Sequence, residues 1–277
     1  MNSPDRYAVI GHPVQHSRSP FIHARFAAQT GQSISYTTID ATPEHFDTAA
    51  RGFFAGGGRG LNVTIPHKEA AARLAAELTP RAQRAGAVNL LAVRSDGRLL
   101  GDNVDGAGLV RDLVTNHHVD ISGRRVLLLG AGGAARGVVA PLLELKPIGF
   151  TIANRNVARA HELAQRFADL GPVRAIGYED LAGKAYDLVI NATASSLAGT
   201  LPPLPPAVID MQTTCYDLAY GRDGTTFSRW AQQLGCAQSL TGLGMLVEQA
   251  AESFQLWRGV RPATTAVLRD LAADMRG

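Results

Sequence analysis

A glycine-rich turn between an apolar strand and a helix constrains the fold of this chain more than any other feature. Residues 126–129 are a continuous run of Val and Leu, followed by GAGGAA at 130–135 and an Ala-, Val- and Leu-rich segment. An uninterrupted apolar run is typical of a parallel strand buried on both faces. The turn matches G-x-G-x-x-G/A, in which the glycines permit a tight turn and close approach of a pyrophosphate, and the small Ala135 allows close helix packing.

Because the N-terminus of a helix attracts phosphate, this turn predicts a Rossmann domain that binds a dinucleotide. A glycine-rich turn that binds no ligand is the alternative. The residues expected to contact the cofactor are Gly130, Ala131, Gly132, Gly133 and Ala134.

The residues at the end of the next expected strand indicate which dinucleotide binds. NAD enzymes place Asp or Glu there, about 20 residues after the glycine turn, to bond the ribose 2′-OH. This chain instead has Asn154 and Arg155, with Arg159 four residues further along. Two guanidinium groups at i and i+4 near a helix start can both face the 2′-phosphate of NADP. We therefore predict NADP rather than NAD; two solvent-exposed arginines are the alternative, which cofactor preference would decide.

Strand-like and helix-like segments alternate along the chain, which is typical of an α/β fold. In the first half, Pro20, Pro43 and Pro66 are each expected in the first turn of a helix, where proline suits helix entry; the helix from Pro66 is expected to reach residue 78. The segments 87–94 and 97–103 predict a hairpin that turns at Asp-Gly.

In the second half, the expected strands alternate with helices as in a parallel βαβ series, at 126–129, 150–155, 173–176 and 187–193. A helix is expected at 106–115, and a long helix begins near Gly244. A chain of 277 residues is long enough for about two domains. We place the domain boundary within 103–122; the helices from 244 onward could belong to either domain.

Three polar residues lie at the end of one strand of the first half or shortly after it. Asn62 and Thr64 are two residues apart and are expected to point to the same face, so both can contact one ligand. Lys68 is expected in the first turn of the following helix, near the same strand end. A lysine is mildly disfavoured there by the helix dipole, which favours a specific role over a solvated side chain.

Other polar residues lie near expected helix or strand ends. Ser17 and Ser19 precede a helix and can either cap it or hold a carboxylate with the helix N–H groups. Asp105 enters a helix and could be its N-cap. Asn89 is expected at a strand start. Gln249 is expected in the middle of a helix, where an amide usually faces water.

Composition and charge exclude several classes of protein. Hydrophobic residues are 45% and charged residues 18% of the chain, a balance typical of a globular protein. No apolar run is long enough to span a membrane, and the first residues do not resemble a signal peptide, so we expect a cytoplasmic protein. The net charge of +3 comes from scattered arginines. Because they form no basic patch with interleaved aromatic residues, we expect no nucleic-acid partner.

Metal and disulfide sites are also not expected. Cys215 and Cys236 are outside any CxxC spacing. His12 and His16 have an i, i+4 spacing, but Pro13 lies between them and no Cys or carboxylate cluster accompanies them.

A series of motifs covers nearly the whole chain, from about residue 8 to 262, and resembles the shikimate dehydrogenases in order and spacing. The motifs are HSRSP, NVTIPHK, AVN, GDNVDG, GAGGAARG, NRNVAR, NAT, YDLAY and GLGMLVEQAAESFQLWRG. The resemblance implies NADP-dependent, reversible reduction of 3-dehydroshikimate to shikimate, in chorismate and aromatic amino acid biosynthesis. It also implies a small-molecule substrate and a monomer or homodimer.

The resemblance implies the domain arrangement as well. The expected N-terminal α/β catalytic domain, with a mostly parallel sheet, spans 1–104, and the NADP-binding Rossmann domain spans 105–243. The C-terminal helices, about 244–277, are expected to pack back on the first domain, with the active site in the cleft between the two.

The resemblance also assigns roles to residues by motif. Lys68 and Asp105 resemble the catalytic pair. The substrate-binding set corresponds to Ser17, Ser19, Asn62, Thr64, Lys68, Asn89, Asp105, Tyr220 and Gln249. Cofactor binding extends from the glycine turn and arginines to Thr193, Gly242 and Met245. The chain departs from the family pattern at Leu90, Val104, Asn156 and Thr241; these departures change hydroxyl contacts near the substrate and cofactor but not the expected chemistry.

Hydride transfer to the C3 carbonyl leaves an oxygen that needs a proton, which Lys68 can donate while Asp105 favours its charged form. One alternative is a dual quinate/shikimate dehydrogenase that uses NAD, which the two arginines argue against. The other is a non-catalytic NADP-sensing regulator on the same fold, which the presence of both Lys68 and Asp105 disfavours.

Overall fold

The computed structural model describes residues 3–181, 183, 185–196 and 198–276 of the chain. These residues form two compact units: unit 1 contains the residues up to 108 together with 246–275, and unit 2 contains 109–245. The chain leaves unit 1 within α5 (Asp105–Arg111) and returns to it within α9 (Leu243–Arg258). Each unit has one mostly or fully parallel sheet, so the predicted α/β class is confirmed.

Unit 1 is built on a six-stranded sheet in the order β2-β1-β3-β5-β6-β4. β1 pairs in parallel with β2 and β3, and β5 pairs antiparallel with β3 and β6, which confirms the predicted hairpin. The strands are β1 (Asp5–Gly11), β2 (Ile34–Asp40), β3 (Gly58–Val63), β4 (Glu77–Leu78), β5 (Leu90–Val93) and β6 (Leu99–Asp102).

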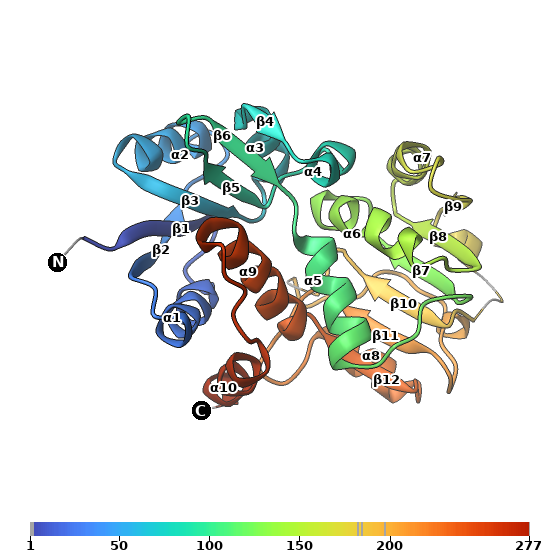
Figure 1. Ribbon diagram of the computed structural model, residues 1–277. Helices are drawn as coiled ribbons and strands as arrows, with labels where there is room; N and C mark the ends of the chain where they lie inside the picture. The colour runs from blue at the N-terminus through green and yellow to red at the C-terminus, as the bar shows by residue number, and fades with distance from the viewer. Residues whose placement is uncertain (1–2, 182, 184, 197, 277) are drawn as a thin grey trace. The chain divides into compact units, whose positions relative to one another are not determined.

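Helices cover both faces of this sheet (Figure 1): α1 and α9 lie on one face, and α2 and α3 lie on the other. Phe46 and Phe53 of α2 pack with Ala8 and Ile10 of β1 in one buried cluster, while Trp257 of α9 packs against Tyr7 on the opposite face. Besides α9, the helices of unit 1 are α1 (Ser19–Thr30), α2 (Phe46–Ala55), α3 (Lys68–Leu74), α4 (Pro80–Ala85) and α10 (Thr265–Arg276).

Unit 2 has a fully parallel sheet in the order β12-β11-β10-β7-β8-β9. Leu127 and Leu129 pack in one buried cluster and Val126 and Leu128 in another, so the central apolar strand is covered on both faces as predicted. The strands are β7 (Arg125–Leu129), β8 (Gly149–Ala153), β9 (Val173–Ile176), β10 (Leu188–Asn191), β11 (Thr214–Asp217) and β12 (Gln238–Thr241).

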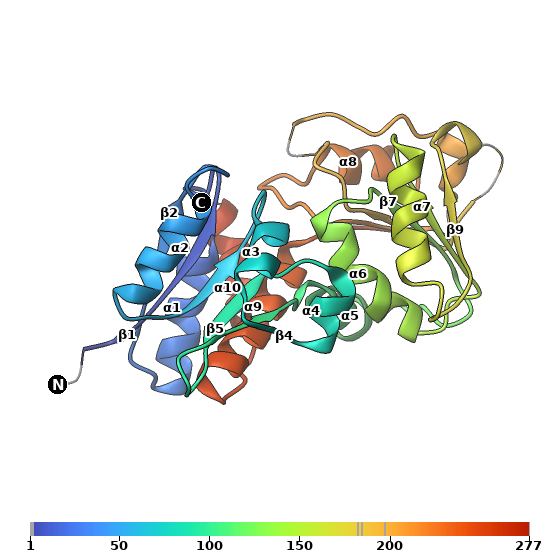
Figure 2. The ribbon, with the colours of Figure 1, turned by 90° about the horizontal axis from the view of Figure 1, so that it is seen from above.

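The helices of unit 2 are divided between the two faces of the sheet (Figure 2), with α6 and α7 on one side and α8 on the other. The regular helices are α6 (Gly133–Glu144), α7 (Val157–Arg166) and α8 (Thr226–Gln233). α5 continues into a π-helical turn, Asp112–Asn116. Short 3₁₀ turns occupy Glu179–Leu181 and Pro206–Val208.

Several predicted helix boundaries are wrong. The helix expected from Pro43 begins at Phe46. The helix expected at 66–78 begins at Lys68 and ends at Leu74, with Pro66 outside it and β4 at Glu77–Leu78. α4 was not predicted, although Thr79 supplies an N-cap hydroxyl to Ala82 N–H and Pro80 occupies the first turn. Such short elements have too few residues to show a hydrophobic period.

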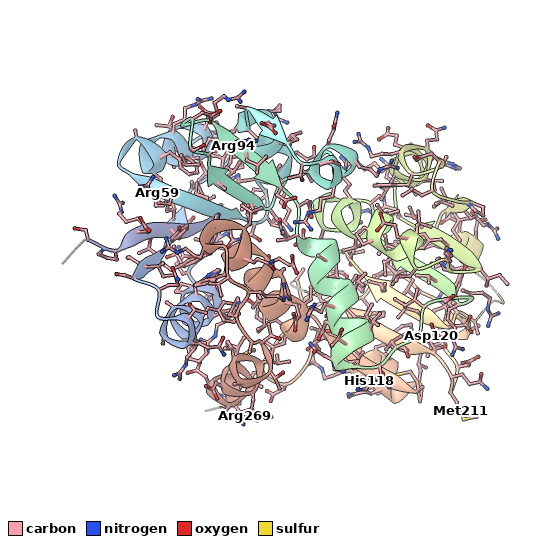
Figure 3. The ribbon with its side chains drawn as sticks, in the orientation of Figure 1. Arg59, Arg94, His118, Asp120, Met211 and Arg269 are labelled. Carbon is pink, nitrogen blue, oxygen red and sulfur yellow. The ribbon has the colours of Figure 1, made fainter. Side chains whose placement is uncertain are left out.

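The positive charges of unit 1 are dispersed over its surface (Figure 3), where the labelled arginines lie on separate elements. Arg59 of β3 pairs with Asp5 at 3.5 Å, Arg94 after β5 pairs with Glu77 at 2.7 Å, and Arg269 lies on α10. Within the described part of the chain, no helix is both long and apolar enough to cross a membrane.

Candidate active site

A buried ion pair lies near the carboxyl end of β3 in unit 1. Lys68 Nζ is 2.5 Å from Asp105 Oδ2, and the two side chains are 12% and 7% exposed. Lys68 is the first residue of α3 and Asp105 the first residue of α5, so two helix starts bring the charges together. An ion pair removed from water in this way interacts more strongly than an exposed pair. The Lys68 ammonium group of this pair can serve as a proton donor to a bound ligand.

Two asparagine side chains hold Asp105, one through its carboxylate and one through its backbone N–H. Asn89 Nδ2 donates to Asp105 Oδ1 at 2.8 Å, while Asn89 Oδ1 accepts from Val104 N. Asn103 Oδ1 accepts from the Asp105 backbone N–H at 3.2 Å. The two carboxylate oxygens of Asp105 therefore accept from Lys68 and Asn89, and the residue lies inside the helix rather than at its N-cap position.

A second buried carboxylate anchors the strand end from which Asn103 and Asp105 follow. Asp102 is 1% exposed and accepts from Arg81 Nε and Nη2 at 2.7 and 2.5 Å, and from Thr79 Oγ1 at 2.5 Å. Burial opposes ionisation of Asp102, but the Arg81 guanidinium and the Thr79 hydroxyl hold its pKa below its usual value. The pair was not predicted, because 21 residues separate its members.

Asn62 is held from two sides. Its Oδ1 accepts from the Tyr36 hydroxyl at 2.7 Å, and its Nδ2 donates to Ser253 Oγ of α9 at 2.8 Å. Tyr36 stacks on the buried His23 ring, with centroids 4.2 Å apart. Burial lowers the pKa of His23 to about 3, so its ring is neutral at pH 7. This support for Asn62 was not predicted, since it joins four separate elements.

The remaining predicted residues of unit 1 lie in or beside the same network. Ser17 Oγ accepts from Ser19 N–H at 3.3 Å, and Ser19, the first residue of α1, is buried within hydrogen-bonding reach of Tyr36. Gln249 does not simply face water as expected: it is half-buried, and its Oε1 accepts from Asn89 Nδ2 at 3.4 Å. Thr64 is half-buried just beyond the end of β3.

A cavity of about 840 Å³ also opens on unit 1, but it lies at the other end of the sheet, around the starts of β1 and β3. The arginines in its wall have protein partners: Arg6 donates to Gly56 O, Arg51 pairs with Asp47 and Arg59 pairs with Asp5. Cavity volume therefore does not identify the candidate active site of this unit.

In unit 2, the glycine turn has the backbone geometry that the fingerprint requires. Gly130 has φ of +101°, and a Cβ there would lie 3.1 Å from Thr193 Cγ2. Gly132 is the N-cap of α6, and a Cβ added to it would meet no atom within 4 Å. The first turn of a twelve-residue helix thus starts beside open space. This arrangement fits the pyrophosphate of a dinucleotide.

Arg155 follows the carboxyl end of β8 and Arg159 lies in the first turn of α7, and both residues are exposed. Asn154 Nδ2 donates to Asn156 O at 2.8 Å, and Asn156 caps α7 by accepting from Arg159 N–H. The departure from the family pattern at Asn156 therefore supplies a helix cap. Two exposed guanidinium groups on a fixed turn fit the 2′-phosphate of NADP.

The other predicted cofactor residues lie on loops and helix starts of unit 2. Thr193 Oγ1 donates to Asn191 Oδ1 at 2.7 Å. Gly242 N–H donates to Ala219 O, and a Cβ on Gly242 would lie 2.1 Å from Leu218 O, so only glycine fits. Tyr220 is half-buried, and Met245 is 7% exposed as part of the core.

A further glycine, Gly244, was named from the sequence only as the approximate start of a helix. The buried Asp112 carboxylate accepts from the Tyr216 hydroxyl at 2.6 Å and lies against the start of α9, where a Cβ on Gly244 would be 1.9 Å from Asp112 Oδ1. Gly244→Ala is expected to lower the free energy of unfolding by about 1–3 kcal/mol or more, because the methyl group must displace a buried carboxylate. Urea unfolding measures this loss.

The matched control is Gly149→Ala, since a Cβ on Gly149 would meet no atom within 4 Å. Equal stability of the Gly244→Ala and Gly149→Ala variants would contradict the close packing.

Comparison with protein families matches three segments of the chain. Residues 9–91 match the shikimate dehydrogenase substrate binding domain. Residues 112–199 match shikimate / quinate 5-dehydrogenase, and residues 242–271 match the shikimate 5′-dehydrogenase C-terminal domain.

Individual proteins are similar over almost the full length. A shikimate dehydrogenase (NADP(+)) of Methylococcus capsulatus is 55% identical over 276 residues, which cover 100% of this chain and 99% of the relative. The crystal structure of an Ael1 enzyme from Pseudomonas putida is 45% identical with a TM-score of 0.89, covering 96% of this chain and 98% of that one. The shikimate 5-dehydrogenase of Thermus thermophilus, in complex with NADP(H) and shikimate, is 33% identical with a TM-score of 0.84, covering 98% and 99%. By these similarities, the chain belongs to the shikimate dehydrogenase family.

Proposed function

We propose that this protein is an NADP-dependent shikimate dehydrogenase, which reversibly reduces 3-dehydroshikimate to shikimate in chorismate and aromatic amino acid biosynthesis. The observation that carries the proposal is the buried Lys68–Asp105 pair, with 2.5 Å between Nζ and Oδ2. Full-length similarity to NADP(+)-dependent shikimate dehydrogenases supports both the reaction and the cofactor. The alternatives of an NAD-dependent dual enzyme and a non-catalytic regulator are not favoured by these relatives.

Lys68 moves the proton in the proposed reaction. When bound, NADPH supplies a hydride to the substrate carbonyl carbon. The carbonyl oxygen gains negative charge as the hydride arrives, and the Lys68 ammonium stabilises that charge and donates a proton to the oxygen. Asp105 Oδ2 accepts a hydrogen bond from Lys68 Nζ and so holds the ammonium group in position before transfer. In the oxidation direction, neutral Lys68 accepts the proton of the alcohol.

The polar network of unit 1 would bind the substrate. We assign the substrate carboxylate to Ser17 and Ser19, beside the start of α1, and to Tyr220. We assign the ring hydroxyls to Asn62, Thr64, Asn89, Asp105 and Gln249. The existing hydrogen bonds of Asn62 and Asn89 fix their amides before the substrate arrives, which reduces the ordering that binding requires.

Unit 2 would bind NADP(H). We assign the pyrophosphate to the glycine turn. We assign the 2′-phosphate to Arg155 and Arg159, with Asn154 holding the turn that precedes α7. We assign the nicotinamide side to Thr193, Gly242 and Met245. We propose residues 1–104 with 244–277 as the substrate-binding domain and 105–243 as the NADP-binding domain. We further propose a cytoplasmic monomer or homodimer with no nucleic-acid partner.

Asp105→Asn tests this assignment. The neutral amide removes the charged partner that holds the Lys68 ammonium group, and it replaces a charged bond to the substrate. We expect kcat to fall and the KM for shikimate to rise, each by about tenfold or more, because bonds to charged groups contribute about 1.5–3 kcal/mol. Initial rates at varied shikimate and saturating NADP⁺ measure both constants.

Asp96→Asn is the matched control, because Asp96 is an exposed carboxylate that pairs with Arg98. An Asp105→Asn enzyme with the KM of the wild type would contradict the proposed substrate-binding role of Asp105. An unchanged kcat would contradict its proposed catalytic role beside Lys68.

A further inference from the structure

Unit 2 contains a buried carboxylate that has no role in the proposed reaction. Asp217 is the last residue of β11 and is 0% exposed. It lies next to Asn191, the last residue of β10, in the parallel register of the two strands. Burial raises the pKa of the Asp217 carboxyl, while bonds from Ser196 and Thr225 oppose the rise. Burying an acid is unfavourable unless hydrogen bonds compensate for the lost water.

The Asp217 carboxylate accepts hydrogen bonds from separate segments of unit 2. Oδ2 accepts from Ser196 Oγ at 2.5 Å and from Thr225 Oγ1 at 2.6 Å. Oδ1 accepts from Asn191 Nδ2 at 3.2 Å and from Ala219 N at 3.1 Å. The donors belong to the end of β10 and the loop after it, the segment after β11 and the N-cap of α8, so one carboxylate ties these three segments together.

On one side, Asp217 supports the turn that carries Thr193. Asn191, which donates to Asp217, accepts at its Oδ1 from Thr193 N–H at 3.1 Å and from Thr193 Oγ1 at 2.7 Å. Thr193 Oγ1 is also 2.5 Å from Ser195 Oγ. Ser196 closes the same turn by its bond to Asp217. The turn is therefore held at both ends through Asp217.

On the other side, Asp217 supports the backbone next to Gly242 and Tyr220. Its bond to Ala219 N fixes the residue whose carbonyl oxygen accepts from Gly242 N–H at 3.0 Å. Ala219 directly precedes Tyr220, and Thr225 ends the same segment as the capping-box residue of α8. Thr193, Tyr220 and Gly242, which the proposed function assigns to cofactor and substrate, all lie on backbone that Asp217 holds.

We propose that Asp217 is a positioning residue that sets the affinity for NADP(H) by holding the Thr193 turn and the Ala219 segment in their binding geometry. The inference rests on the proposed function for the identity of the dinucleotide. Asp217 contacts no reacting atom, so its loss changes binding rather than the chemical step. Loss of Asp217 is therefore expected to differ from loss of Lys68, which is expected to lower kcat.

Asp217→Ala removes all four hydrogen bonds and is expected to raise the Kd for NADPH about tenfold or more. Because the interaction serves binding alone, kcat at saturating substrates is expected to change about threefold or less. NADPH fluorescence titration measures Kd without turnover. Hydrogen exchange measured by mass spectrometry is expected to be faster in the segment 191–196. In Asp217→Asn, the amide oxygen can still accept and the amide N–H groups can donate to the hydroxyls of Ser196 and Thr225, so NADPH affinity is expected to return at least in part.

Ser196→Ala keeps the proposal testable if Asp217→Ala does not fold. It removes the bond from Ser196 to Asp217 and the bond that Ser196 Oγ accepts from Asn191 Nδ2 at 3.2 Å. The Kd for NADPH is expected to rise severalfold while the thermal midpoint stays close to that of the wild type. Asp223→Ala, an exposed acid in the same segment, is the control.

A folded Asp217→Ala variant whose Kd for NADPH is within twofold of wild type would overturn the proposal. If Asp217→Ala does not fold, an unchanged Kd in Ser196→Ala would overturn it. A wild-type protein that binds NADPH but does not oxidise shikimate would count against the proposed function, and the binding measurements would still decide the part played by Asp217.

Discussion

Lys68→Ala is expected to lower kcat by about 10²- to 10⁴-fold, the range associated with loss of a general acid. The ammonium group of Lys68, 2.5 Å from Asp105, is the proton donor that we propose for the carbonyl oxygen. Its removal also leaves the Asp105 carboxylate without its cationic partner. Because Lys68 belongs to unit 1 and the glycine turn to unit 2, the Kd for NADPH is expected to change little. Initial rates and NADPH titration measure the two quantities separately.

The control for this experiment is Arg73→Ala, which removes an exposed cation from the same helix, α3. Its kcat is expected to equal that of the wild type. A Lys68→Ala enzyme that retains kcat would exclude Lys68 as the proton donor, and one that loses NADPH binding in parallel would mean that the residue acts on the cofactor instead.

The double variant Arg155→Ala/Arg159→Ala is expected to lose its preference for NADP over NAD. Each guanidinium can make charged hydrogen bonds to the 2′-phosphate, which contribute about 1.5–3 kcal/mol each, so the KM for NADP⁺ is expected to rise about 10²-fold or more. NAD⁺ has no 2′-phosphate, so its KM is expected to change little. Rates with both cofactors at saturating shikimate measure the preference directly.

Arg174→Ala is the matched control, since Arg174 is an exposed arginine of the adjacent strand β9. Its cofactor preference is expected to match that of the wild type. If the double variant kept the full preference for NADP⁺, residues other than Arg155 and Arg159 would have to bind the 2′-phosphate. The role assigned to these two arginines would then be wrong.

The elements predicted well from sequence are those whose signal is local. The apolar run before the glycine turn predicted β7, and the Asp-Gly turn predicted the β5–β6 hairpin. The strand expected at 173–176 coincides with β9. In each case, neighbouring residues alone determine the strand or the turn. Lys68 was singled out because a cation is disfavoured at the start of a helix, whereas its pairing with Asp105 was implied by the resemblance to the shikimate dehydrogenases.

The features that sequence reasoning missed depend on contacts between distant residues. Tyr36 holds Asn62, Arg81 holds Asp102, and the donors to Asp217 come from four separate positions. The start of α3 was misplaced because proline at the first helical turn is a preference rather than a requirement. Such networks are fixed by tertiary packing, so the sequence of one chain offers no local sign of them.

The central claim is that this chain oxidises shikimate with NADP⁺. The most direct measurement is the initial rate of NADP⁺ reduction at about 340 nm, the absorption of the reduced nicotinamide, with shikimate, with quinate, and with NAD⁺ in place of NADP⁺. We expect rapid reduction only with shikimate and NADP⁺. Comparable rates with quinate or NAD⁺ would contradict the assigned specificity, and tight NADPH binding without turnover of any pair would contradict the assignment of an enzyme.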